Sequence, residues 1–81
     1  MESHRDEIIK IISEKLGVAQ DEINEESNFA RDLNVGQLEI NDLILMLEAK
    51  LKVEISQEET ASIQTVGDLI EHITAHLDEP S

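Results

Sequence analysis

The stretch DLNVGQLEINDLILMLEAKL, residues 32–51, decides the fold of this chain. It predicts a short loop followed by one long helix over 37–51, because apolar residues recur there at the three-to-four spacing of a helical stripe. The stripe comprises Leu38, Leu43, Leu47 and Leu51, widened by Ile40, Ile44 and Met46. The acids Glu39, Asp42 and Glu48 are then expected to face outward.

Length and composition restrict the fold class. A chain of 81 residues is long enough for one domain and too short for two. The apolar fraction is 40%, yet the chain has one Phe, no Trp and no Tyr, so its core must be built from Ile, Leu and Val. Such a composition suits packed helices better than a β-sandwich, and we therefore expect an all-α fold.

The same composition bears on location. The chain has no cysteine, which excludes disulfides and thiolate metal sites and fits a reducing compartment. The first residues are charged, and no apolar run is long enough for a signal peptide or a membrane span. We expect a cytoplasmic protein without membrane insertion.

The net charge of −13, from 19 acids against 6 bases, indicates which partners the chain can attract. It disfavours nucleic acid and anionic membranes and favours basic protein surfaces. We expect a monomer that binds such surfaces. The alternative, that the excess acid only keeps the domain in solution, stays open.

A first helix is predicted over about 4–16. Ile8, Ile12 and Leu16 fall on one face, and Ser3 can cap the start. Gly17 then supplies a C-terminal stop. From residue 18 to 36 no period persists, and the polar composition indicates a long loop. Its widely spaced apolar residues are expected to anchor it to the core; they are Val18, Ile23, Phe29 and Leu33.

Two more helices are predicted after residue 51. Ser56 and Glu59 form a capping-box pattern that begins a short helix over about 57–62. Thr65 can cap a last helix over about 66–77, and Pro80 lies beyond its end. The apolar stripe of this helix is the most regular in the chain, with Val66, Leu69, Ile70, Ile73 and Leu77.

The central stretch resembles the acyl carrier protein family, whose loop and second helix read Asp-Leu-Gly-x-Asp-Ser-Leu before an acidic helix that carries Leu and Met. The matching residues are Asp32, Leu33, Leu38, Leu43, Leu47 and Glu48. Phe29, the Glu54-Ile55 turn and the opening of the last helix extend the resemblance over nearly the whole chain. The resemblance implies a four-helix bundle with three main helices, one short helix and a long ordered first loop.

One position departs from this family in a way that affects its chemistry. The serine that carries the 4′-phosphopantetheine arm is Gln37 here, and the Asp before it is Gly36. An amide nitrogen is not nucleophilic and cannot form the phosphodiester. Between Ser27 and Ser56 the chain has no Ser, Thr, Tyr or Cys, so no shift within the helix supplies a hydroxyl. We therefore expect no cofactor on this chain.

The resemblance also implies a docking surface on the second helix, where the family presents acids to basic patches on partner enzymes. Glu39, Asp42 and Glu48 keep that character, and Met46 lies among them. The pattern departs at Ala49, Lys50 and Lys52, where the family commonly has acids. The alternative is an ordinary solvated helix face.

Three further residues could form a metal site. Asp68, His72 and His76 are spaced four apart on the last helix and could share one face. The more frequent role of such histidines is interaction with the helix dipole, and we expect no metal. No nucleophile–base pair, phosphate loop or buried acid pair is present in the pattern, so we do not expect an enzyme.

Two functions remain to be weighed. The first is an acidic protein-binding module of acyl-carrier type without the arm, which docks through residues 37–51 to an enzyme of lipid or acyl metabolism or to another basic partner. The second is a genuine carrier in fatty-acid or polyketide synthesis, with an unconventional attachment site or with Gln37 as an inactivating change. Non-covalent lipid binding is a third and weaker alternative.

Overall fold

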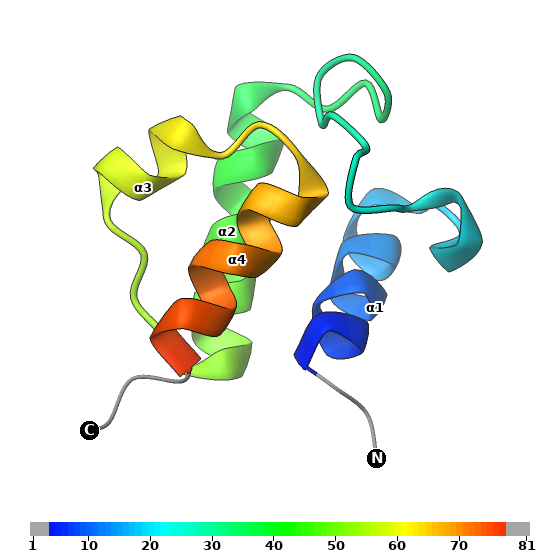
Figure 1. Ribbon diagram of the computed structural model, residues 1–81. Coiled ribbons are helices and arrows are strands. Elements are labelled where there is room, and N and C mark those ends of the chain that lie inside the picture. Colours follow the sequence, from blue (N-terminus) through cyan, green and yellow to red (C-terminus); the bar gives the residue numbers. More distant parts are fainter. Residues whose placement is uncertain (1–3, 78–81) are drawn as a thin grey trace.

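A computed structural model describes residues 4–77 of the chain. These residues form four α-helices and one turn of 3-10 helix, joined by loops and arranged as Figure 1 shows. Their bounds are His4–Leu16 for α1, Gln20–Glu22 for η1, Gln37–Leu51 for α2, Gln57–Ser62 for α3 and Val66–Leu77 for α4. The expected all-α fold is confirmed, and α1 to α4 cover the ranges that the sequence predicts. The cap predicted at Ser3 and the stop at Pro80 lie outside the described residues.

The core lies between α1, α2 and α4. Helix α1 packs against both of the others, and it buries Ile8, Ile9, Ile11 and Ile12. Helix α4 buries Val66, Leu69, Ile70 and Ile73. Phe29 from the loop is fully buried with them and is the largest side chain of the core. The core is therefore aliphatic around a single ring, as the composition requires. No helix within residues 4–77 is long and apolar enough to cross a membrane.

Helix α2 differs from the prediction at its first turn. Ile40, Leu43, Ile44 and Leu47 are buried, and Met46 and Leu51 pack partly against the core. Leu38, however, is 80% exposed, so its predicted place in the buried stripe is wrong. The reason is helix geometry, because two residues of an α-helix span roughly 200° and Leu38 lies two before Ile40. Leu45, two after Leu43, is 63% exposed for the same reason.

The loop from 18 to 36 is ordered by the anchors that its sequence predicts. Ile23 and Phe29 are buried, and Val18 and Leu33 pack partly against the core. The loop also pairs with the start of α4: the Phe29 amide donates to Gln64 O at 3.0 Å, and the Val66 amide donates to Ser27 O at 3.0 Å. These non-local bonds explain how a loop of this length keeps one conformation.

The helix ends have the predicted local chemistry. Gly17 ends α1 with a φ of 69°, a left-handed conformation that glycine adopts without strain. Ser56 and Glu59 form the reciprocal capping box at the start of α3. The Thr65 hydroxyl accepts from the Asp68 amide at 3.1 Å at the start of α4. Short-range hydrogen bonding thus fixes where these helices begin and end.

Candidate functional site

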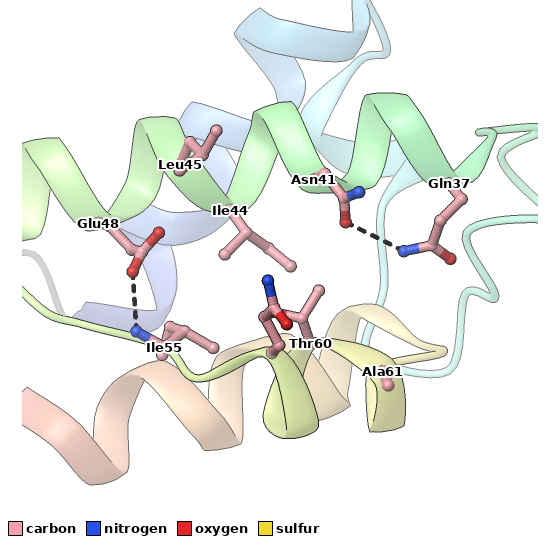
Figure 2. A pocket seen from close by; sticks show the side chains of 9 residues that line it. Gln37, Asn41, Ile44, Leu45, Glu48, Ile55, Thr60 and Ala61 are labelled. Carbon is pink, nitrogen blue, oxygen red and sulfur yellow. Dashed lines mark hydrogen bonds between the residues drawn. The ribbon is translucent and has the colours of Figure 1, made fainter.

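The site begins where the loop enters α2. Gly36 is the N-cap residue, with φ −80° and ψ 168°, and no side chain caps the helix there. Gln37 is exposed, and its amide nitrogen donates to Asn41 Oδ1 at 3.1 Å (Figure 2). Gln37 therefore occupies the first helical position, where its amide group is held by the next turn of α2.

The two serines that flank this stretch have structural roles. Ser27 is only 6% exposed, and its hydroxyl accepts from the Asn24 amide at 3.2 Å. Ser56 is the N-cap of α3, and its hydroxyl accepts from the Glu59 amide at 3.1 Å. Neither hydroxyl lies at the start of α2, where the family resemblance would place a modified serine.

The outward side of α2 carries a mixed acidic and apolar surface. We call Leu38, Glu39, Asp42 and Leu45 the α2 outer face; all four side chains are exposed. Two large leucines beside two carboxylates give a surface that can contact apolar and basic groups together. The sequence pattern predicts the exposed acids but not the exposed leucines, because Leu38 fits the spacing of the core stripe.

The other two predicted docking residues are placed differently. Met46 is half-buried and packs against the core. Glu48 is also half-buried, and its carboxylate accepts a hydrogen bond from the Ile55 amide at 2.8 Å. The expectation that Glu48 faces outward is therefore wrong. Its side chain turns toward the segment that follows α2 (Figure 2).

A groove of about 380 Å³ lies between α2 and α3. Asn41 and Gln37 lie toward one end of it and Glu48 toward the other, with Ile44 between them (Figure 2). The remaining lining residues are Leu45, Ile55, Gln57, Thr60 and Ala61. The lining is thus mixed: the apolar side chains of Ile44, Leu45, Ile55 and Ala61 lie among polar groups from both helices.

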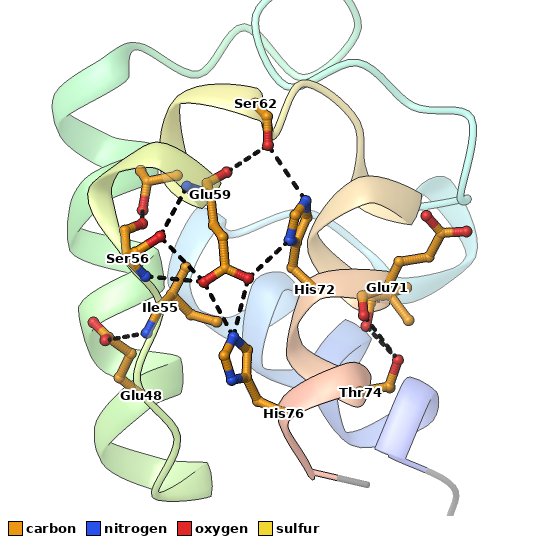
Figure 3. Close-up of polar contacts among 11 residues, drawn as sticks. Glu48, Ile55, Ser56, Glu59, Ser62, Glu71, His72, Thr74 and His76 are labelled. Carbon is orange, nitrogen blue, oxygen red and sulfur yellow. Dashed lines mark hydrogen bonds and ion pairs between the residues drawn. The ribbon is translucent and has the colours of Figure 1, made fainter. Parts of the chain in front are cut away.

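A polar cluster joins α3 to α4, and we call Glu59, Ser62, His72 and His76 the Glu59 cluster (Figure 3). His76 Nε2 lies 3.0 Å and 3.1 Å from the two Glu59 carboxylate oxygens, and His72 Nδ1 lies 3.3 Å from one of them. The Ser56 backbone amide lowers the pKa of Glu59 most, and the imidazoles of His76 and His72 lower it further, to about 2 against partial burial. Glu59 is therefore an anion at neutral pH.

The predicted grouping of Asp68 with the two histidines is not what the structure brings together. The Asp68 carboxylate accepts hydrogen bonds from two backbone N–H groups, that of Gln64 at 3.1 Å and that of Thr65 at 3.2 Å. The hydrogen bond from the Gln64 backbone N–H is the largest cause of the lowered pKa of Asp68. Glu59, from another helix, occupies the position beside the histidines. No group of three or more metal-ligating residues within 4–77 could hold a metal ion.

Comparison with known proteins identifies the class of this fold. A family model described as "Phosphopantetheine attachment site" matches residues 6–73. The acyl carrier protein of Clostridium perfringens is 43% identical over 74 residues, which cover 91% of this chain and 97% of the relative. That of Chlamydia caviae is 44% identical over 71 residues, which cover 88% of this chain and 92% of the relative.

A solved structure agrees with these sequence matches. The crystal structure of an acyl carrier protein from Thermotoga maritima superposes with a TM-score of 0.79 at 27% identity, covering 95% of this chain and 94% of the other. The chain belongs to the acyl carrier protein family. Members of this family are carriers rather than enzymes, and this chain is accordingly not an enzyme.

Proposed function

We propose that this chain is an acyl-carrier-like protein-interaction module that bears no 4′-phosphopantetheine arm. It docks through the α2 outer face onto a basic surface of a partner enzyme of lipid or acyl metabolism. The observation that carries the proposal is Gln37 at the first position of α2, with no hydroxyl or thiol residue between Ser27 and Ser56. A carrier needs a hydroxyl nucleophile at that position.

The geometry around Gln37 supports the loss of the arm. The Gln37 amide bonds to Asn41 and offers no nucleophilic oxygen that could attack a phosphorus atom of an incoming cofactor. The flanking serines are a buried loop residue and a helix cap. Modification of Ser27 would require it to leave the core, and modification of Ser56 would disturb the cap of α3.

Charge and exposure support the docking role. The chain carries a net charge of −13, and Glu39 and Asp42 lie on an exposed face between Leu38 and Leu45. Charge steers a basic partner to the surface, while apolar contacts at the centre of an interface supply most of the affinity. The partner surface that fits combines Arg or Lys side chains with an apolar patch.

Intact mass measurement after expression with a phosphopantetheinyl transferase tests the missing arm. The parent is compared with Gln37→Ser, with Gln37→Ala as a control that lacks a hydroxyl, and with Gly36→Asp/Gln37→Ser. An Asp fits at position 36, since a Cβ there meets no atom within 4 Å. We expect an unmodified parent and a modified double variant. A parent protein that gains the mass of the phosphopantetheine arm would refute the proposal and favour the genuine-carrier alternative.

Binding of the Gly36→Asp/Gln37→Ser form to the same transferase tests the α2 outer face. Glu39→Lys/Asp42→Lys is expected to weaken binding at low salt, because it reverses two charges at the proposed contact. The matched control is Asp21→Lys/Glu22→Lys, which makes the same charge change on η1, where both residues are exposed. Equal loss in both variants would mean that net charge alone attracts the partner and would contradict a docking face on α2.

A further inference from the structure

Helix α3 has no buried residue and contacts α4 through polar groups. It is six residues long. The apolar anchors Ile55 and Ile63 lie just outside it, half-buried and buried respectively. Within the helix, Glu59 and Ser62 make the contacts to α4 shown in Figure 3. The attachment of α3 therefore depends on the state of the Glu59 cluster.

The hydrogen bonds around His72 distinguish a charged ring from a neutral one. The Ser62 hydroxyl donates its one hydrogen to the Glu59 backbone oxygen at 2.8 Å, so toward His72 Nε2, 3.3 Å away, it can only accept. His72 Nδ1 faces the Glu59 carboxylate, which is also an acceptor. A neutral imidazole carries one N–H, whereas the imidazolium carries two. The charged ring satisfies both contacts while the Ser62 hydroxyl keeps its bond to the Glu59 backbone oxygen, whereas a neutral ring with its proton on Nδ1 requires that hydroxyl to turn toward Nε2 instead.

His76 adds a second charge-dependent contact on the same carboxylate. Its Nε2 lies near both Glu59 oxygens, so one N–H is shared between them. Protonation turns this bond from a neutral donor to the Glu59 carboxylate into an ion pair with charge on both partners, which is stronger. Among the described residues, charged groups near the two rings include Lys52 and Glu54, which line a surface hollow with His76, and Asp68, which acts on His72 from one turn away on α4.

We propose that His72 and His76 form a proton-controlled latch that sets how firmly α3 is held against α4. With both rings charged, Glu59 and Ser62 hold α3 in place. When the rings lose their protons, the Ser62 hydroxyl can no longer bond the Glu59 backbone oxygen and His72 together, and the contacts of both rings with the Glu59 carboxylate weaken. Because Gln57, Thr60 and Ala61 of α3 form one wall of the groove beside α2, release of the latch opens that groove. The latch does not depend on whether the chain carries an arm.

Amide hydrogen exchange measured by NMR between about pH 5.5 and 8, a range that spans the ordinary pKa of histidine, tests the latch. The readout is the protection of the Thr60 and Ser62 amides relative to that of Leu69 in α4, after correction for the intrinsic exchange rate. We expect this ratio to fall by about threefold to tenfold as pH rises, the size that one or two partly exposed ion pairs provide. The ratio removes any global effect of pH on the stability of the whole protein.

The matched variants are His72→Gln/His76→Gln, which keeps a neutral donor at each position, and His4→Gln, which removes a histidine from α1 instead. We expect a flat ratio in the first variant and the parent's pH dependence in the second. Glu59→Gln is a third variant. We expect it to flatten the protection ratio, because it removes the anion that both histidines contact. A flat ratio in the parent, or an unchanged pH step in the double histidine variant, would overturn the latch.

Discussion

The carboxylate of Glu48 in α2 accepts a hydrogen bond of 2.8 Å from the backbone amide of Ile55, seven residues further along the chain. This bond ties the end of the long helix to the segment that leads into α3. A residue that the acyl carrier pattern would assign to partner docking thus has a structural role here. Stability should therefore depend on Glu48 more than on the other acids of α2.

We expect Glu48→Ala to lower the free energy of unfolding by about 1–3 kcal/mol, because it leaves the Ile55 amide without its charged acceptor. Glu48→Gln keeps an acceptor oxygen and should cost less. Glu39→Ala, at an exposed position, is the control and should change stability by no more than about 0.5 kcal/mol. Urea unfolding followed by circular dichroism measures all three. Equal losses at positions 39 and 48 would show that the Glu48 bond contributes nothing.

Gly67 lies in the first turn of α4, directly against the loop. A Cβ at this position would stand 2.9 Å from the Glu25 backbone oxygen, which also accepts the Gly67 amide at 2.9 Å. In an open helix Gly→Ala stabilises by up to about 1 kcal/mol. Here we expect Gly67→Ala to destabilise by about 1–3 kcal/mol, since backbone must move to relieve the clash. Gly36→Ala, where a Cβ meets no atom within 4 Å, is the comparison; it should lose less stability, through the poorer N-cap preference of Ala alone, and denaturant midpoints distinguish the two variants.

Acid should weaken the fold through Glu59. Its pKa is lowered from 4.5 to about 2, chiefly by the Ser56 amide and then by the two imidazoles. A lowered pKa in the folded state means that the unfolded chain binds the proton more readily. The contribution of Glu59 is therefore fully present above about pH 4.5 and is lost as the pH falls toward 2. The lowered pKa of Asp68 acts with the same sign.

We expect Glu59→Gln to reduce the difference in urea midpoint between pH 6 and pH 3, because it removes one of the groups that must be protonated. Glu58→Gln, at an exposed position on the same helix, serves as the control for loss of one negative charge. An acid-induced drop in midpoint that is as large in Glu59→Gln as in the parent would contradict a role for Glu59.

Salt should stabilise this protein. A net charge of −13 on a chain of 81 residues repels itself in the compact state. Added salt screens this repulsion, with a Debye length of about 10 Å at 0.1 M. We expect the melting temperature to rise as monovalent salt increases from about 10 mM to 0.2 M. A melting temperature that falls over this range would mean that attractive ion pairs outweigh the repulsion.

The helices could be predicted because their signals are local. Periodic apolar residues, the Ser56–Glu59 capping box and the turn at Gly17 each act within a few residues, and the structure has the helices where these signals place them. The same holds for Ile23 and Phe29, which stood out as isolated apolar residues in a polar loop. For the candidate site, the sequence revealed Gln37 and the exposed acids Glu39 and Asp42.

The remaining features depend on contacts between distant residues. Glu59 meets His72 and His76 across 13 and 17 positions of sequence, so helical spacing alone suggested Asp68 as their neighbour instead. Glu48 turns inward because a free backbone amide at Ile55 lies within its reach. Neither the Glu59–histidine contacts nor the Glu48–Ile55 bond can be inferred from periodicity, because the packing of α3 beside α2 and α4 brings these groups together.

Leu38 and Leu43 of α2 differ sharply in burial, so substitutions at the two positions can be compared directly. Leu43 is fully buried, whereas Leu38 is 80% exposed, although both belong to one leucine-rich run. We expect Leu43→Ala to cost about 2–5 kcal/mol, the usual range for a core leucine, and Leu38→Ala to cost no more than about 0.5 kcal/mol. If the leucine belongs to the docking surface, Leu38→Ala should weaken partner binding while leaving urea unfolding unchanged. A large stability loss at Leu38 would instead return this leucine to the core and remove it from the α2 outer face.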